Sequence, residues 1–95
     1  MSQVEWLPEA IADLDRVHRF WMAKDLAVAT RAIARLRQAA ALLRDAPELG
    51  RPMEGASARE LLVLFGAGSY VLRYRVTPSA VVILRVWHSR EVVVQ

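Results

Sequence analysis

Apolar and polar positions alternate at the start of the chain and then change to a helical spacing. Val4 and Trp6 lie between polar neighbours, which predicts a short strand. Apolar side chains then recur at steps of three and four residues: Ala10, Ile11, Leu14, Val17 and Trp21. This spacing predicts a helix over residues 9–22 and places Asp13 and Asp15 largely on its opposite, polar side.

A second apolar stripe follows a three-residue interruption at residues 23–25. It consists of Ala29, Ile33, Leu36, Ala40 and Leu43. Asp25 has a side chain suited to a helix N-cap, so we expect a second helix from about Leu26 to about Asp45. Two consecutive helices with such a short connection form an antiparallel hairpin.

Proline and glycine interrupt the chain after the second stripe, and the period then changes. Residues 46–58 contain Pro47, Gly50 and Pro52, so we expect a loop there. Three strands are predicted to follow, at residues 59–65, 70–76 and 81–88, with turns at Gly66–Gly68 and Thr77–Ser79. This order predicts a single α+β domain over residues 1–95, of the form β-α-α-β-β-β, with the helical hairpin on one face of a small, mainly antiparallel sheet.

The alternation along the last two strands predicts which side chains face the helices. We expect that face to hold Tyr70, Leu72, Tyr74, Val76, Val82, Leu84, Val86 and His88. The uncovered face then carries three arginines and an exposed tryptophan: Arg73, Arg75, Arg85 and Trp87. Such a composition is typical of the centre of a protein interface. The alternative is a set of solvated arginines paired with Glu54 and Glu60.

Composition limits the class of protein. Of the 95 residues, 55% are hydrophobic and 24% are charged, and none is cysteine. These values argue against intrinsic disorder, a disulfide scaffold, a thiolate zinc site and a cysteine nucleophile. The start of the chain has no signal-peptide pattern, and the longest uncharged apolar run, residues 61–68, is too short to span a bilayer. We therefore expect a soluble, cytoplasmic protein with no membrane partner.

The net charge of +3 is unevenly distributed along the chain. Residues 1–48 contain as many basic as acidic groups, so the whole excess lies in residues 49–95. Lys24 is the one lysine, and the other basic residues are all arginines. Arginine suits bidentate recognition of carboxylate or phosphate. A coding bias toward arginine, with the charges on a solvated face, is the alternative for the first half.

Few side chains could carry catalysis or hold a cofactor. His18 and His88 are the only histidines, and no acidic cluster accompanies them, so we predict neither a metal site nor a cofactor. No serine comes with an identifiable base and orienting group. His88, near Arg85 and Arg90, is the one credible general base, and a role in burial or capping is its alternative.

Five short motifs occur in order along nearly the whole chain. They are Glu5-Trp6-x-Pro8-x-Ala10-x-x-Asp13-Leu14, Pro47-x-x-Gly50-Arg51, Arg59-Glu60-Leu61, Tyr70-x-x-x-Tyr74-Arg75-Val76 and Val82-x-Leu84-Arg85-Val86-Trp87-His88-x-Arg90. Together they resemble the RelE/ParE superfamily of toxins from type II toxin–antitoxin systems. The resemblance implies a RelE/ParE-like fold and a cytoplasmic toxin that a cognate antitoxin neutralises in a hetero-oligomer.

The superfamily divides by target, and the resemblance is closer to its ParE branch. ParE-type members inhibit DNA gyrase and act in plasmid stabilisation, whereas RelE-type members cleave messenger RNA in the ribosome. Val71 and Ser89 stand where the nucleases often carry other residues, and the chain ends at Gln95 without a terminal tyrosine. We therefore expect a gyrase inhibitor. The alternatives are a RelE-like endoribonuclease with His88 and Arg85 as catalytic residues, and a degenerate toxin that only binds its antitoxin.

The resemblance also implies a surface for the antitoxin. We predict that the contact residues are Arg59, Arg73, Arg75, Arg85, Trp87, His88 and Arg90, with grooves alongside the helices for an amphipathic segment. The tail Val92–Val94 is predicted to pair with a partner strand. We expect that reversing the charges of Arg73 and Arg85 together weakens antitoxin binding and leaves the fold intact.

Overall fold

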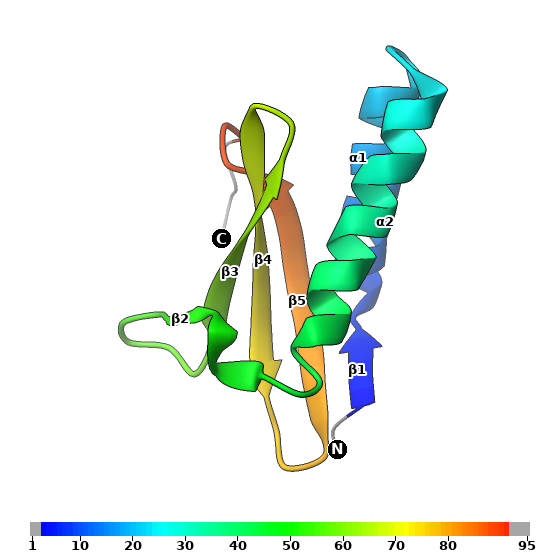
Figure 1. The fold of residues 1–95 in the computed structure, drawn as a ribbon. Helices are drawn as coiled ribbons and strands as arrows, with labels where there is room; N and C mark the ends of the chain where they lie inside the picture. The colour runs from blue at the N-terminus through cyan, green and yellow to red at the C-terminus, as the bar shows by residue number, and fades with distance from the viewer. Residues whose placement is uncertain (1–2, 92–95) are drawn as a thin grey trace.

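The computed structural model describes residues 3–91, so the strand pairing predicted for Val92–Val94 lies outside the described residues. The described chain contains, in order, β1 (Gln3–Trp6), α1 (Pro8–Met22), α2 (Leu26–Leu42), a 3-10 helix (Pro47–Leu49), β2 (Arg51–Pro52), β3 (Arg59–Phe65), β4 (Gly68–Val76) and β5 (Ala80–His88). Figure 1 shows α1 and α2 side by side against one face of the sheet. The predicted α+β fold with its helical hairpin is confirmed.

The five strands form one sheet in the order β1-β5-β4-β3-β2. β1 runs parallel to β5, whereas the other neighbouring pairs are antiparallel, so the sheet is mainly antiparallel as predicted. The 3-10 helix and β2 lie within the stretch predicted as a loop. A strand of two residues is too short for its periodicity to be detected in the sequence.

The helical hairpin follows the predicted pattern closely. The Asp25 carboxylate accepts a hydrogen bond from the Ala27 N–H (2.9 Å), which confirms the predicted N-cap of α2. The helix ends at Leu42, before the predicted end at about Asp45, because the Leu43 N–H bonds to the Ala40 carbonyl in a tighter turn. Small buried side chains on α2 allow α1 to approach closely: Ala29, Ala32, Ala39 and Ala40.

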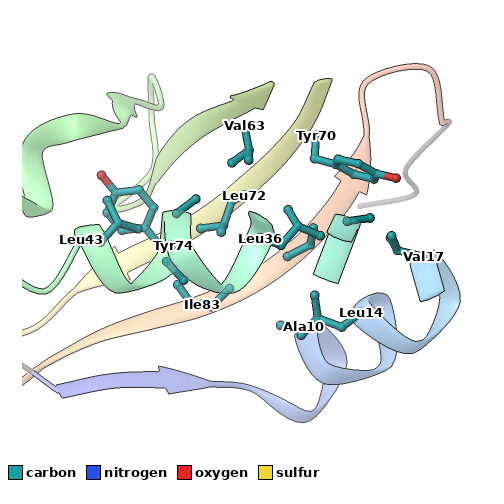
Figure 2. Close-up of a cluster of buried hydrophobic side chains, with 14 of the residues drawn as sticks. Ala10, Leu14, Val17, Leu36, Leu43, Val63, Tyr70, Leu72, Tyr74 and Ile83 are labelled. Carbon is teal, nitrogen blue, oxygen red and sulfur yellow. The ribbon is translucent and has the colours of Figure 1, made fainter. Parts of the chain in front are cut away.

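The hydrophobic core lies between the helices and one face of the sheet, which we call the closed face (Figure 2). Its largest fully buried side chains are Tyr74, Leu36, Leu43, Leu72, Ile83, Val63, Val81 and Val86. The Tyr74 hydroxyl donates to the Pro47 carbonyl (2.6 Å) and accepts from the Gly50 N–H (2.8 Å). A Cβ at position 50 would lie 2.6 Å from this hydroxyl, so the loop before β2 needs a glycine where it meets Tyr74.

A β-bulge in β5 changes which of its side chains face the helices. Arg73 of β4 pairs with Arg85, but the next residue, Tyr74, pairs with Ile83, so Leu84 is the extra residue. Val81 and Ile83 therefore join Val86 on the closed face, and all three are fully buried. The prediction that Val82 and Leu84 pack on the helices was wrong because it continued one alternation through the bulge.

The far end of β4 keeps the predicted face but is not covered. Val76 pairs with the buried Val81 on the helix-facing side, as expected, and is nevertheless 43% exposed. The pairing with β5 continues to Val76 and Val81, so the strand itself is longer than its covered part.

Candidate functional site

The carboxylate of Asp13 is buried on α1, although the helical spacing placed it on the polar side. It accepts hydrogen bonds from the Arg85 Nε (2.8 Å) and from the backbone N–H of Val86 (2.8 Å), and it also forms an ion pair with Arg16. Arg16 in turn donates to the Val86 carbonyl (3.0 Å). A buried carboxylate is stable when charged groups and backbone donors bind it in this way.

These bonds replace a missing strand partner. β1 ends at Trp6, which pairs with Ile83, so among residues 3–91 no strand lies beside β5 on that side beyond this point. Asp13 and Arg16 supply an acceptor and a donor to both backbone groups of Val86. The side chains of α1 therefore continue the hydrogen bonding of the sheet where β1 stops.

The electrostatics of Asp13 follow from the same contacts. Burial alone would disfavour the ionised carboxyl, but the hydrogen bonds from Arg85, Val86 and Arg16 outweigh it, and the pKa of Asp13 lies below its usual value. The prediction that Arg85 protrudes from the uncovered face with Arg73 was wrong, because the Arg85 guanidinium is bound to Asp13 of α1. The bulge and the buried carboxylate together account for this difference.

The face opposite the helices, which we call the open face, carries Arg73, Arg75 and Trp87 as predicted, but the contacts of Arg73 and the burial of Trp87 differ from the prediction. The Arg73 guanidinium forms an ion pair with Glu60 (2.8 Å) and lies 4.8 Å from the ring centroid of Trp87. Trp87 is 8% exposed, so the prediction of an exposed tryptophan was wrong. The pairing of Arg73 with Glu60 matches the alternative interpretation. Arg75 is exposed as expected.

Two leucines that the sequence analysis did not single out dominate the open face. Leu62 and Leu64 of β3 are 63% and 69% exposed. Leu62 pairs with Val71 of β4, and Val71 pairs with Trp87 of β5, so an apolar row crosses three strands. We call Leu62, Leu64 and Val71 the leucine patch. The signal that could have found it is the period of two along a strand, which places Leu62 and Leu64 on the same face as the charged Glu60.

His88 and Arg90 lie at the other end of β5, beside the tip of the helical hairpin. The His88 ring packs edge-on against Tyr70, with centroids 5.2 Å apart, and its Nδ1 accepts from the backbone N–H of Arg90 (3.1 Å). A Cβ at residue 68 would lie 2.7 Å from the His88 Nε2, so Gly68 makes room for the ring. His88 thus has the capping contacts expected under its alternative role.

Two adjoining cavities share this end of the molecule. Their volumes are about 510 and 550 Å³, and both are lined by Trp21, His88 and Arg90. Burial raises the pKa of the Tyr70 hydroxyl, which accepts a hydrogen bond from the Trp21 Nε1 (2.7 Å). The Tyr70 hydroxyl therefore keeps its proton at neutral pH.

Arg59 occupies a third location. Its guanidinium donates to the Gly50 carbonyl (2.7 Å) and so holds the loop before β2. The seven predicted contact residues are thus divided among the loop at Gly50, the open face, α1 and the end of β5. Within residues 3–91, we find no cluster of three metal-ligating side chains and no helix long and apolar enough to cross a membrane.

Comparison with known proteins identifies the family. Residues 4–93 match the family model described as ParE toxin of type II toxin-antitoxin system, parDE. The chain belongs to the ParE toxin family. Its relatives include Toxin RelE3 of Caulobacter vibrioides, 43% identical over 91 residues that cover 96% of this chain and 98% of the relative. Toxin RelE1 of the same organism is 35% identical over 83% of this chain and 84% of its own length.

Solved structures support the fold of this ParE-family toxin. The chromosomal ParDE TA system from P. aeruginosa contains a chain with a TM-score of 0.81 and 23% identity, covering 93% of this chain and 96% of that one. A conserved hypothetical protein from Helicobacter pylori matches with a TM-score of 0.56 and 19% identity, over 96% and 98% of the two chains. The resemblance to RelE/ParE toxins is confirmed, and the chain is a type II toxin–antitoxin toxin.

Proposed function

We propose that this type II toxin inhibits DNA gyrase and that a cognate antitoxin neutralises it. The observation that carries the proposal is that Arg85 and His88, the two residues on which the nuclease alternative depends, are both engaged in hydrogen bonds within the toxin itself. The Arg85 guanidinium is bonded to Asp13, and the His88 Nδ1 is bonded to the Arg90 N–H. Cleavage of RNA needs a base, an acid for the leaving oxygen and cations on the phosphate.

The open face also supports a protein target. This face presents the exposed Leu62 and Leu64, which suit a protein surface, and its Arg73 is paired with Glu60. A ribosome-dependent endoribonuclease is the second candidate, because the relatives in Caulobacter are named RelE toxins.

One paired assay separates the two candidates. We expect the purified toxin to block supercoiling by gyrase and to leave messenger RNA intact in programmed ribosomes. Codon-specific cleavage together with normal supercoiling would reject the gyrase proposal. Inactivity in both assays, with antitoxin binding retained, would identify a degenerate toxin that serves only as a binding module.

The antitoxin is proposed as a partner in a hetero-oligomer, since the neighbour in P. aeruginosa is described as a ParDE TA system. Two cavities of about 480 and 590 Å³ adjoin at Trp6 and Arg37, between β1 and the helices. Arg44 lines the second cavity, and α2 has three arginines and no acidic residue. These features favour an acidic, amphipathic segment of the antitoxin. We propose a cytoplasmic location for the toxin and for its antitoxin.

The two adjoining cavities, which together we call the groove, are tested by charge reversal. We expect Arg37→Glu with Arg44→Glu to weaken antitoxin binding at least about tenfold in titration calorimetry, because the opposite charges that attract the segment are lost. Arg19→Glu is the control on α1. Arg75 and Arg90, the exposed members of the predicted contact set, are tested in the same way. Equal affinities for the groove variant and the control would remove the groove from the antitoxin interface.

A further inference from the structure

We propose that the leucine patch on the open face is the surface through which the toxin contacts its protein target. The partner surface presents apolar side chains at its centre and carboxylates at its border. This inference rests on the proposal that the target is a protein.

Contiguity distinguishes the patch from ordinary surface leucines. Leu62 and Leu64 have the highest exposed fractions among the large hydrophobic side chains of the described chain. Leu62 pairs with the half-buried Val71 of β4, which in turn pairs with the buried Trp87 of β5, so the exposed leucines continue into an apolar row rather than standing alone. Both helices cover the other face (Figure 1). An apolar surface of this kind on a small domain is characteristic of an interaction site.

The charges next to the patch define the chemistry of the partner. Arg51 of β2 pairs with Glu60, which in turn pairs with Arg73, so these three residues form the row beside the apolar one. Glu60 is already bonded to Arg73, whereas Arg51 and Arg75 are exposed cations. Carboxylates on the partner would complement them. A second copy of the toxin would bring the same arginines together, which disfavours self-association through this face.

A nucleic acid fits this surface less well than a protein does. Proteins that hold single strands combine a groove of cations with aromatic rings on which bases stack. Here the Arg73 guanidinium lies over the Trp87 ring, and only 8% of Trp87 is exposed. Leucine side chains offer phosphate no hydrogen bond, but they fit the apolar centre of a protein interface.

The experiment compares two pairs of equally exposed leucines. Leu62→Thr with Leu64→Thr removes the patch and keeps side chains that suit a strand. Leu26→Thr with Leu42→Thr, at 61% and 58% exposure on α2, is the matched control. Each variant is induced in cells without the antitoxin to measure growth arrest, and the purified proteins are titrated against gyrase and against the antitoxin. Melting temperatures check the folds.

We expect the patch variant to lose growth arrest and at least about tenfold of its potency against gyrase, since an apolar interface centre carries most of the binding energy. Its affinity for the antitoxin should stay within about twofold, and the control should behave as the parent chain does. Arg51→Glu with Arg75→Glu should also weaken gyrase inhibition, most strongly at low salt.

The outcomes separate this inference from the proposed function. Growth arrest that survives in the patch variant overturns the inference, and so does an equal loss of antitoxin affinity, which would assign the patch to the antitoxin. If the parent chain cleaves messenger RNA and leaves supercoiling normal, the gyrase proposal is rejected. If the patch variant then cleaves messenger RNA as well, the inference is also rejected. A parent chain that arrests nothing overturns both.

Discussion

The two faces of the sheet differ most clearly along β3, where they alternate residue by residue. Val63 is 1% exposed on the closed face, whereas its neighbours Leu62 and Leu64 are more than half exposed on the open face. The apolar side chains of the closed face stabilise the fold. Those of the open face gain little from folding, so their apolar surface is available for binding. The same type of residue thus stabilises the fold on one face and is left exposed to solvent on the other.

The largest effect is expected from a cavity in the closed face. Leu36 of α2 is fully buried, so Leu36→Ala should lower the free energy of unfolding by about 3 kcal/mol through lost burial and an unfilled space. Leu42→Ala, at an exposed position of the same helix, should cost less than about 0.5 kcal/mol. Urea denaturation measures both. Equal losses would contradict the assignment of the core.

Charge reversal on the arginines comes next. Arg73→Glu with Arg85→Glu would place new carboxylates against Glu60 and the buried Asp13. We expect a loss of about 2–3 kcal/mol in stability, because removing the partner of a buried charge is costly. This reverses the sequence-based expectation that the fold stays intact. An unchanged melting temperature would show that Asp13 does not depend on Arg85.

The Asp13 carboxylate should also make stability depend on pH. Its pKa is lowered in the fold, so its contribution is complete above the unfolded value of about 3.9 and declines as the pH falls through the lower folded value. Asp13→Asn should cost about 2 kcal/mol at neutral pH and flatten this acidic decline. Asp15→Asn, at an exposed position, is the control. Parallel pH curves for the parent chain and Asp13→Asn would contradict the assignment.

The smallest effect is expected on the open face. Leu62→Thr with Leu64→Thr should change the free energy of unfolding by less than about 1 kcal/mol in total, since both side chains are already in water. Val63→Thr, between them, buries an unpaired hydroxyl and should cost about 1–2 kcal/mol. Thermal unfolding of the two variants tests whether the faces differ as described. A larger loss from the two leucines would contradict the comparison.

Most of the fold could be predicted from the sequence because its signals are local. Asp25 and the apolar spacing around it define the helical hairpin, and turns rich in glycine or proline separate the last three strands. The bulge at Leu84 could not be predicted, since Val81 to Leu84 are all apolar and suit either face. The parallel partner of β1 could not be predicted either, because strand pairing across the chain leaves no local pattern.

The candidate surfaces were harder to predict. The sequence pattern placed Asp13 with the solvated charges of α1, because its burial depends on a strand edge that exists only in the folded sheet. Arg73 and Trp87 were predicted on the open face, but their mutual contact and the bond to Glu60 are tertiary. Leu62 and Leu64 were not predicted on the open face because residues 61–65 are all apolar, so polarity within the run does not mark a face.

The contact between Asp13 and Val86 joins residues 73 positions apart, and β1 pairs with β5 next to it. Contacts of such long range form late, because the intervening chain must be ordered first. During synthesis, therefore, this sheet cannot be completed until β5, the last of its five strands, has left the ribosome. A chain interrupted before β5 lacks the strand that joins β1 to β4, and the Asp13 carboxylate then has neither Arg85 nor Val86 to bind it.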